Sequence, residues 1–389
     1  MAVNKVDING ATVIDLTGDS VTPETLLQGA TAHDASGATI TGTMVRGTEL
    51  KIIVSGASGA TVTATKGNLS VSGTSVNGTC TLTVPEAGTW SVKAVVSGET
   101  LQSEVVVSAS TQAVLASAVL NNCSWEIIRK VSDMGLGENY WSIGDGKSVT
   151  LNGTVGILTL SNYTCYAFII GFNHNAELEG TNRIHFQLAK TAPSGGEDIA
   201  LCDSKYGVQF PSAGFIMNST STNAGGWRDS EMRNKICGTS LSNYSGTMIS
   251  AIPSDLRAAL KSVTKYTDNV GGGSSTRYER SVTATTDYFF LLSEYEVRGD
   301  IRSNEDSSPN PYEPKKQKWY AYYAAGNNPS KRRYDRLTEY ATWWLRTPTT
   351  GYYGAGGFSM AVDMYQAGNV QYIPAGCQND FGLVACFCV

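Results

Sequence analysis

Polar and apolar residues alternate along residues 48–109 in a series of short runs, each bounded by glycine, serine or asparagine. The alternation is clearest in TCTLTV at residues 79–84 and in WSVKAV at residues 90–95. Because successive side chains of a strand point to opposite faces, this pattern places one face in a core and the other in water. Several such strands at short spacing predict a small β-sandwich.

The composition extends this expectation to the whole chain. The 389 residues include 41 glycines and only 16% charged residues, below the usual share of about a quarter in soluble domains. Glycine, serine, threonine and asparagine favour short strands joined by tight turns over long helices. We therefore predict a multidomain, β-rich chain. Within it, residues 48–110 form a sandwich of immunoglobulin-like type with Trp90 in its core, and the simplest role of such a module is that of a spacer.

Residues 1–47 form a distinct opening segment with few apolar side chains. Val13, Ile14 and Leu16 predict one short strand, and Pro23 predicts the start of a single helical turn. A segment this small cannot offset the entropy lost on ordering unless it packs against a partner. We therefore expect residues 1–47 to be an attachment and oligomerisation module.

Charge, hydropathy and cysteine usage exclude several classes of function. The net charge of -5 has the wrong sign for a nucleic-acid surface, so nucleic acid is not an expected partner. No stretch approaches about 18 consecutive apolar residues, and the opening MAVNKVDING lacks the features of a secretory signal. We expect synthesis in a cytoplasm and no membrane insertion. The eight cysteines are expected to be buried free thiols.

Residues 119–389 carry nearly all of the tyrosine and tryptophan, and their patterns predict an α+β domain. Helix starts are expected near residues 229–233 and along residues 253–263. Residues 288–292, YFFLL, predict a buried strand. The polar, proline-containing stretch 299–318 predicts a long surface loop.

Five motifs of this region follow one another in a recognisable order. They are SIGD at residues 142–145, WRDSEMR at 227–233, FLLS at 290–293, WWLRTP at 343–348 and GLVACF at 382–387. In this order they resemble a bacterial and phage domain of unknown function that is marked by WWLRSP and a final GVRPAF-like strand. The last motif departs from that family, because it lacks the arginine and proline of the final strand. The structural signature of the resemblance consists of Trp227, Arg233, Trp343, Trp344 and Arg346.

That domain is similar to the C-type-lectin-like superfamily, which includes the formylglycine-generating-enzyme fold and the variable proteins of diversity-generating retroelements. The resemblance implies that residues 119–389 form a C-type-lectin-like receptor-binding domain, a mixed α/β fold with little regular structure. Separately, VIDLTGDSVT at residues 13–22 and LQGATAHD at residues 27–34 resemble a short module of tail proteins from phages and prophages of gut bacteria.

Together these resemblances imply a phage tail receptor-binding protein that is not an enzyme. It would be a homotrimer and would contact other tail proteins through residues 1–47. It would be assembled in the host cytoplasm as part of the virion tail and act outside the cell on a bacterial surface glycan or protein. The alternatives are a bacterial surface adhesin and a tail-borne glycan depolymerase.

Trp343 and Trp344 face opposite sides if they lie on a strand. One then enters the core, while the other meets a helix or the surface, and both are expected to be structural. Arg346 is expected to pair with a buried carboxylate or with carbonyl groups.

The segment 349–381 has the composition of an adaptable binding surface. Its glycines permit tight, irregular loops, and its polar and aromatic side chains supply ring faces and hydrogen bonds at low entropic cost. The predicted ligand-binding residues are Tyr352, Tyr353, Phe358, Tyr365, Gln366, Asn369, Gln371, Tyr372, Gln378, Asn379, Asp380 and Phe381. Packing in the core is the alternative for any single aromatic residue among them. Retroelement-diversified proteins vary in the last stretch of their chains, so the resemblance implies that this segment is variable too.

Calcium and zinc chemistry have little support in the sequence. Residues 378–380, Gln-Asn-Asp, lack the neighbouring ligand sequences of calcium-dependent sugar sites. The three histidines lie in different regions, so the sequence offers few residues that could form a catalytic triad or a zinc site. His174 is expected to be a loop residue. No metal or other cofactor is predicted.

Two enzyme chemistries remain as alternatives. A glycosidase needs two carboxyl groups about 5 to 9 Å apart, for which Asp287, Glu294 and Glu296 are the candidates. A copper oxidase of the formylglycine-generating type would use a cysteine pair, for which Cys386 and Cys388 have a similar spacing.

Overall fold

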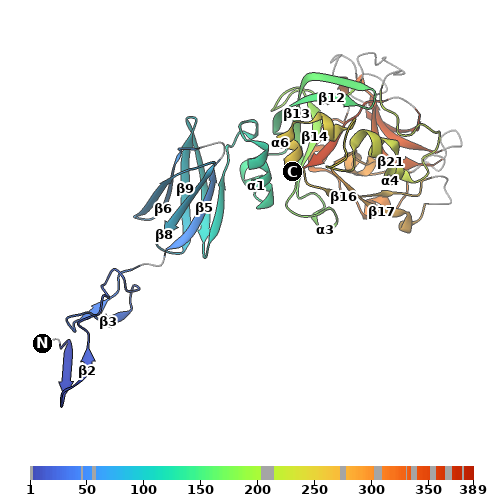
Figure 1. The fold of residues 1–389 in the computed structure, drawn as a ribbon. Helices are drawn as coiled ribbons and strands as arrows, with labels where there is room; N and C mark the ends of the chain where they lie inside the picture. The colour runs from blue at the N-terminus through green and yellow to red at the C-terminus, as the bar shows by residue number, and fades with distance from the viewer. Residues whose placement is uncertain are drawn as a thin grey trace. The chain divides into compact units, whose positions relative to one another are not determined.

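The computed structural model describes residues 3–44, 47–54, 58–202, 214–271, 277–301, 309–329, 331–333, 340–350, 356–363, 370–378 and 381–389. The chain forms two compact units, Met1–Leu115 and Ala116–Val389 (Figure 1). Both units are rich in strands, which confirms the prediction of a multidomain, β-rich chain. Among the described residues, no helix has the length and apolar character needed to cross a membrane.

Two small hairpins occupy the opening segment of the first unit. β1 (Lys5–Ile8) pairs with β2 (Ala11–Asp15), and β3 (Thr31–His33) pairs with β4 (Thr39–Thr41). The strand expected around Val13 is β2, and the expected helical turn is a single turn in which the Leu26 N–H donates to the Thr22 carbonyl at 3.1 Å. Every residue of β2 is exposed.

The remaining strands of the first unit form a two-sheet sandwich around one apolar core. They are β5 (Thr48–Val54), β6 (Thr61–Lys66), β7 (Leu69–Thr74), β8 (Thr79–Val84), β9 (Gly88–Val96), β10 (Glu99–Val107) and β11 (Thr111–Leu115). One sheet has the order β10-β9-β6-β7 and the other the order β11-β5-β8.

Burial in the sandwich follows the alternation of the sequence. In β9, Trp90, Val92 and Ala94 lie in the core, while the residues between them do not. Trp90 is fully buried, and its Nε1 donates to the Glu86 carbonyl at 3.0 Å. The predicted strands and the predicted core position of Trp90 are therefore confirmed, whereas the immunoglobulin-like type stays a prediction.

The largest sheet of the second unit is antiparallel and places the last strand of the chain in its interior. Its order is β12 (Gly146–Val155), β13 (Leu158–Phe172), β14 (Ile184–Lys190), β24 (Cys386–Cys388) and β18 (Phe289–Phe290). Phe387 of β24 pairs with Phe186 on one side and with Phe289 on the other. Its ring centroid lies 5.3 Å from each of theirs, so this strand contributes to the aromatic core.

Three smaller sheets surround this one. The first pairs β16 (Val263–Asp268) with β17 (Val282–Asp287), and the second contains β15 (Ile199–Ala200), β19 (Lys331–Arg333) and β20 (Tyr340–Ala341). The third contains β21 (Trp343–Thr349), β22 (Gly357–Asp363) and β23 (Val370–Gly376). It carries the segment that the sequence predicts to bind ligand.

The helices of the second unit are short. They are α1 (Trp125–Asp133), α2 (Gly137–Tyr140), α3 (Ala176–Glu179), α4 (Gly226–Asp229), η2 (Met232–Cys237), α5 (Met248–Ala251), α6 (Ser254–Ala259), α7 (Glu294–Arg298) and α8 (Ala321–Ala324), with single turns η1 (Leu120–Asn122), η4 (Glu279–Ser281) and η5 (Glu313–Lys315). Helices of this length are stabilised mainly by tertiary packing. The predicted helix start near residue 230 is confirmed, because the Ser230 hydroxyl accepts the N–H of Arg233 at 3.2 Å as η2 begins.

Three expectations for this unit need correction. The helix expected along residues 253–263 ends at Ala259, since the Lys261 N–H donates to the Cys388 carbonyl and Val263 begins β16. Residues 288–292 contain only the two-residue strand β18, although Phe289–Leu292 are buried. The expected surface loop 299–318 is partly internal, because Asn310 and Glu313 are buried, while residues 302–308 lie outside the described residues.

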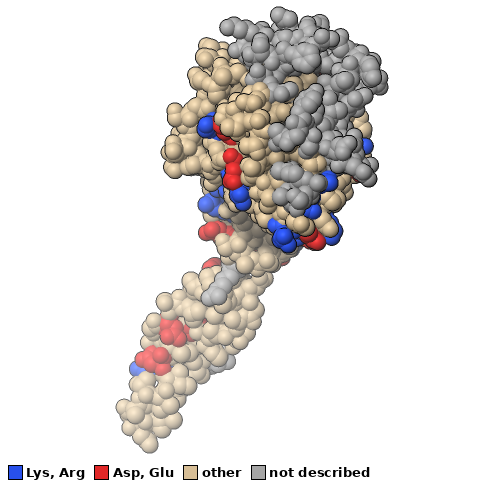
Figure 2. Space-filling view, turned by 90° about the vertical axis from the view of Figure 1, so that its right-hand side faces the viewer, with Lys and Arg blue, Asp and Glu red and all other residues tan. Residues whose placement is uncertain are grey.

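The cysteines are internal, and the charged residues on one face of the molecule are mixed in sign. All eight cysteines are buried and free, as predicted. On the face drawn in Figure 2, most described residues are uncharged, and the lysines and arginines lie near aspartates and glutamates.

Candidate functional site

The sheet β21-β22-β23 frames the segment that the sequence predicts to bind ligand. β21 and β22 are paired as far as Thr349 and Gly357, and β22 and β23 as far as Asp363 and Val370. Among the predicted residues, Gln371 and Tyr372 lie within β23. Those outside the described residues are Tyr352, Tyr353, Tyr365, Gln366, Asn369, Asn379 and Asp380.

Phe358 and Phe381 are buried instead of exposed, which corrects this part of the prediction. Phe358 lies in β22 and pairs with Pro348 of β21 and Ala375 of β23. The ring of Phe381 packs edge-to-face against Trp344, with 4.8 Å between the centroids. Both rings occur in a glycine-rich stretch without periodicity, so no pattern distinguishes them from loop residues.

Asn223 fixes the chain at both ends of residues 350–356. Its side chain is fully buried, and its Nδ2 donates to the Thr349 carbonyl at 2.8 Å and to the Gly357 carbonyl at 2.7 Å. A Cβ on Gly356 would lie 2.6 Å from Oδ1 of Asn223, and Gly356 has a φ of 74°, so this position requires glycine. One carboxamide therefore holds the ends of β21 and β22 together.

A second set of contacts fixes the chain after β23. The N–H groups of Met217 and Asn218 donate to the Cys377 carbonyl at 2.9 and 3.1 Å. Gln378, a predicted ligand-binding residue, is exposed, and its Nε2 donates to the Ser219 carbonyl at 2.7 Å. Residues 217–219 therefore hold the chain at Cys377 and Gln378.

The tandem tryptophans are both fully buried. Nε1 of Trp343 donates to the Pro329 carbonyl at 2.8 Å, and Nε1 of Trp344 donates to the Phe215 carbonyl at 2.6 Å. Each buried indole N–H thus has an acceptor, as a buried tryptophan requires. Neither tryptophan meets the surface, so of the two expected positions for the second ring only contact with a helix stays open, and the expected structural role agrees with their burial.

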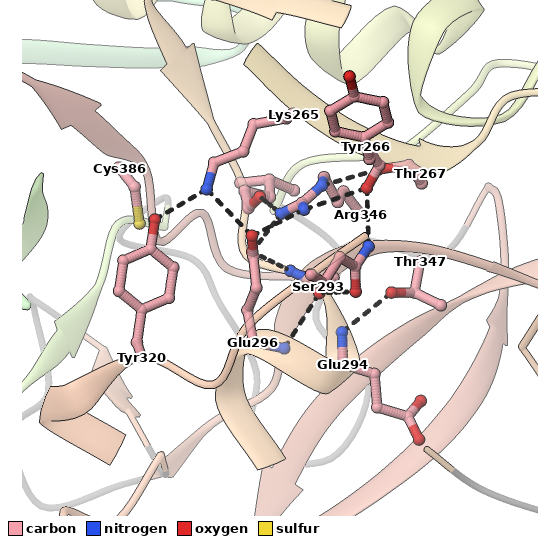
Figure 3. A network of polar contacts seen from close by, with 12 residues as sticks. Lys265, Tyr266, Thr267, Ser293, Glu294, Glu296, Tyr320, Arg346, Thr347 and Cys386 are labelled. Atoms are coloured by element: carbon pink, nitrogen blue, oxygen red, sulfur yellow. Dashed lines mark hydrogen bonds and ion pairs between the residues drawn. The ribbon is translucent and has the colours of Figure 1, made fainter. Parts of the chain in front are cut away.

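Arg346 is the polar centre of β21. It is fully buried and donates to both carboxylate oxygens of Glu296, with 2.9 Å between Nη2 and Oε1 (Figure 3). It also donates to the Leu291 carbonyl at 2.7 Å and to the Thr267 hydroxyl at 2.8 Å. The predicted pairing with a buried carboxylate and with carbonyl groups is confirmed.

Glu296 also closes the N-terminus of α7. The Ser293 hydroxyl accepts the N–H of Glu296 at 3.1 Å, and the Glu296 carboxylate accepts the N–H of Ser293 at 2.9 Å. Sequence SEYE at residues 293–296 carries the signal for this capping box, a serine followed three residues later by glutamate. That signal marks the helix start, but it does not reveal the partner Arg346, which lies 50 residues further on.

Lys265 adds a second buried cation to this network. Its Nζ lies 3.0 Å from Oε1 of Glu296 and 2.8 Å from the Tyr320 hydroxyl (Figure 3). It also lies 2.7 Å from Oε2 of Glu179. Burial alone would raise the pKa of Glu296, but the attraction of Arg346 and Lys265 outweighs burial and lowers it well below its usual range. Glu296 is therefore ionised at neutral pH and is the anion that both cations contact.

His174 lies beside these carboxylates and, with them, could supply ligands to a metal ion. His174, Glu179 and Glu296 offer ligand atoms within 4.8 Å of one another. Burial lowers the pKa of His174 to about 3, so the ring is neutral. The Lys265 ammonium already bridges the two carboxylates, and a metal ion would have to displace it. The arrangement therefore suits an internal ion network better than a metal centre.

His174 is a loop residue, as predicted, but its surroundings are internal. The residue lies in the chain just before α3, as expected of a loop residue, but it is buried and its ring stacks on Tyr320 at 3.6 Å between centroids. Nothing in the flanking asparagines signals this stacking.

The signature residues Trp227 and Arg233 meet at one carboxylate. Trp227 Nε1 donates to Oδ2 of Asp287 at 3.2 Å, and Arg233 Nε donates to Oδ1 at 2.6 Å. Asp287 is fully buried and also accepts the Thr285 hydroxyl at 2.7 Å. The motif WRDSEMR therefore fastens α4 and η2 to the end of β17.

The carboxylates considered for a glycosidase serve internal contacts. Asp287, Glu294 and Glu296 are all fully buried. Glu294 accepts the Ser359 hydroxyl at 2.7 Å and thereby joins α7 to β22. Each of the three is engaged with protein groups and none faces solvent in the described structure.

The cysteines considered for a copper site are buried in β24. Nε2 of Gln187 donates to Sγ of Cys386 at 3.5 Å, and Sγ of Cys388 lies 3.4 Å from Nδ1 of His185. Burial raises the pKa of the Cys388 thiol well above its usual range. Cys388 is therefore a thiol at neutral pH when no metal ion is bound.

Residues 213–388 match a protein family described as a domain of unknown function, DUF6273. The match includes the motifs at residues 227–233, 290–293, 343–348 and 382–387 and therefore the contacts of Asp287, Glu296 and Arg346. Neither the curated proteins nor the solved structures include a significant match to this chain.

Replacing Glu296 by glutamine is expected to lower the free energy of unfolding of the second unit by about 3 to 5 kcal/mol, because Arg346 and Lys265 would remain buried without their shared anion. Chemical denaturation followed by tryptophan fluorescence measures this, since all seven tryptophans except Trp90 lie in the second unit. The matched control is Glu177→Gln in α3, an exposed position. A loss below about 1 kcal/mol in Glu296→Gln would show that the network is dispensable.

Glu313 generates a pH-dependent prediction. Its carboxyl group is fully buried, and burial raises its pKa to about 8, although the Asp268 N–H bond at 2.8 Å opposes the shift. The folded state therefore holds a proton that the unfolded state releases above its ordinary pKa of 4.5. Between pH 4.5 and about pH 8, this group should therefore lower the free energy of unfolding by about 1.4 kcal/mol per pH unit.

In Glu313→Gln this contribution is absent, so the variant should become more stable relative to the wild type as pH rises from 5 to 8. Denaturation midpoints at several pH values, with Glu177→Gln as the control for loss of charge, measure the difference. Parallel stability curves for wild type and Glu313→Gln would contradict a raised pKa at Glu313.

Proposed function

We propose that the chain is the receptor-binding subunit of a phage or prophage tail. In this proposal residues 1–47 attach to other tail proteins and to further copies of the chain, and residues 48–110 act as an immunoglobulin-like spacer. Residues 119–389 form a C-type-lectin-like head that binds a bacterial surface glycan or protein without catalysing a reaction. The protein would be a homotrimer on the virion and would act outside the cell.

The framing of residues 350–356 carries the proposal. Asn223 pins the backbone at Thr349 and Gly357, and the sheet beneath them is held by the buried Arg346–Glu296 pair. Tyr352 and Tyr353 belong to the chain between these pinned ends. Tyrosines in a short sequence between two fixed strand ends favour ligand binding, because ordering such side chains costs little entropy.

The exposed apolar residues of the opening segment support self-association. Ile8, Val13 and Ile14 of the β1–β2 hairpin are 55%, 60% and 45% exposed. A two-stranded hairpin with no apolar face covered is at best marginally stable in water. Packing against identical hairpins in further copies of the chain would cover these side chains, and a trimer also gives several weak heads a combined avidity.

The binding proposal predicts that the double variant Tyr352→Ala/Tyr353→Ala binds host cells at least about tenfold more weakly, because it loses two stacking faces. The assay is flow cytometry of the fluorescently labelled full chain on a panel of gut bacterial strains. Tyr163→Ala is the control, since Tyr163 lies in β13, a strand of a different sheet from β21, β22 and β23.

If the folded double variant binds host cells as strongly as the wild type, the binding site lies elsewhere on the chain. Incubation with capsule and cell wall of the bound strain, followed by measurement of reducing ends, separates binding from depolymerase activity. Turnover that disappears in Glu294→Gln would favour the enzyme alternative.

The self-association proposal predicts that the wild-type chain has the mass of a trimer and that Val13→Asp/Ile14→Asp has the mass of a monomer. Burying two new carboxylates in the hairpin contacts would be strongly unfavourable. Size-exclusion chromatography with light scattering measures the mass. The control is Val106→Asp in β10, a valine that is 68% exposed and lies outside residues 1–47, and this variant should stay trimeric. A trimeric Val13→Asp/Ile14→Asp would move the association surface elsewhere.

A further inference from the structure

A polar cleft of about 440 Å³ lies in the second unit, outside the segment 349–381. Its walls come from α1, from the chain before β14, from the chain between α6 and β16, and from Leu241 and Tyr288. The volume is in the range of small-molecule sites. The charged residues that line it are Arg129, Asp133, Arg183 and Lys261.

Arg183 is held in place by the backbone around it. Its Nε donates to the Ser262 carbonyl at 2.8 Å, and its Nη1 donates to the Thr181 carbonyl at 2.8 Å. A Cβ on Gly180, which has a φ of 104°, would collide with this guanidinium, so the position requires glycine. Among the described residues, Nη2 of Arg183 has no hydrogen-bond partner, although the rest of the group is fixed.

Arg129 is fixed in the same way. Its Nη1 donates to the carbonyls of Ala259 and Leu260, each at 3.1 Å, and its Nε donates to Oδ1 of Asp133 at 2.9 Å. Its Nη2 likewise lacks a partner within the described parts of the chain. The structure therefore lines one cleft with two anchored guanidinium groups, each of which has an unused donor.

Lys261 increases the positive charge of the cleft. It is 9% exposed, and its Nζ lies 2.7 Å from Oδ1 of Asp133, the same oxygen that Arg129 contacts. Burial lowers the pKa of Lys261, Asp133 opposes this, and the nearby charges of Arg129 and Arg183 lower it further. The lining thus contains three cations and one carboxylate, which Arg129 and Lys261 contact, and this leaves an excess of two positive charges when all four groups are ionised.

An anionic group is the ligand chemistry that matches this excess. Guanidinium groups bind carboxylate and phosphate oxygens with short, charge-assisted hydrogen bonds, and anchored guanidinium groups lose little entropy on binding. Tyr288 lines the same cleft, is half-buried and has no hydrogen-bond partner among the described residues. Its ring and hydroxyl could contact the uncharged part of a small polar ligand, such as the ring of an acidic sugar.

We infer that this cleft binds the carboxylate or phosphate of a small polar molecule such as an acidic sugar, through Arg129 and Arg183. The site is separate from the binding segment 349–381 and does not depend on the function proposed above.

The test is isothermal titration calorimetry of the full chain with D-glucuronate, D-glucose 6-phosphate and D-glucose. We expect saturable binding of one or both acidic sugars and none of glucose, and we expect the affinity to fall as salt is raised. Binding of glucuronate alone identifies a carboxylate site, binding of the phosphate ester alone identifies a phosphate site, and mutual competition identifies a site for either group.

Arg183→Gln and Arg129→Gln are each expected to weaken binding at least about tenfold, with folding checked by circular dichroism. Arg280→Gln, at an exposed arginine outside the cleft, is the matched control and should bind as the wild type does. If one of the two variants fails to fold, the other provides the measurement, and Tyr288→Phe tests the hydroxyl with little change in volume. The inference is overturned if glucose binds as tightly as the acidic sugars, if neither acidic sugar binds, or if folded variants of both arginines bind like the wild type.

Discussion

The carboxylate of Glu296 connects three elements of the second unit, β21, β16 and α7. It accepts hydrogen bonds from Arg346 in β21, from Lys265 in β16 and from the Ser293 N–H at the start of α7. In a buried site of low dielectric, a charge without its partner would be strongly unfavourable, so the docking of β21 and α7 is coupled through the Arg346–Glu296 pair. The placement of β21, and with it the frame around residues 350–356, follows from this requirement.

Side chains satisfy much of the polar backbone in this unit, because its strands and helices are short. Asn223 binds two carbonyls at the end of the C-terminal sheet, and the indoles of Trp343 and Trp344 bind two more. The Asp287 carboxylate accepts hydrogen bonds from an indole, a guanidinium and a hydroxyl group. Buried polar groups need partners whether or not regular structure supplies them, so a domain with little regular structure needs such residues at specific positions. The motifs of residues 227–233 and 343–348 contain several of them.

The sequence predicted what local patterns determine. Alternation identified the strands around Trp90, and the tryptophan and arginine types of WWLRTP indicated burial and ion pairing. The sequence did not identify Glu296 as the partner of Arg346, because a contact between residues 50 positions apart has no local signal. Phe358 and Phe381 were misassigned for a related reason, since a stretch without periodicity does not separate core rings from exposed ones. The cationic cleft was missed because Arg129, Arg183 and Lys261 come together only through tertiary structure.

The position of β24 has a consequence for the order in which the chain can fold during synthesis. Residues 386–388 form the strand between β14 and β18, so the largest sheet of the second unit stays divided until residue 388 has emerged from the ribosome. The sandwich of the first unit needs nothing beyond residue 115 and can complete its core long before that. A nascent chain would thus carry a finished N-terminal unit next to a second unit whose two unpaired strand edges favour engagement by chaperones.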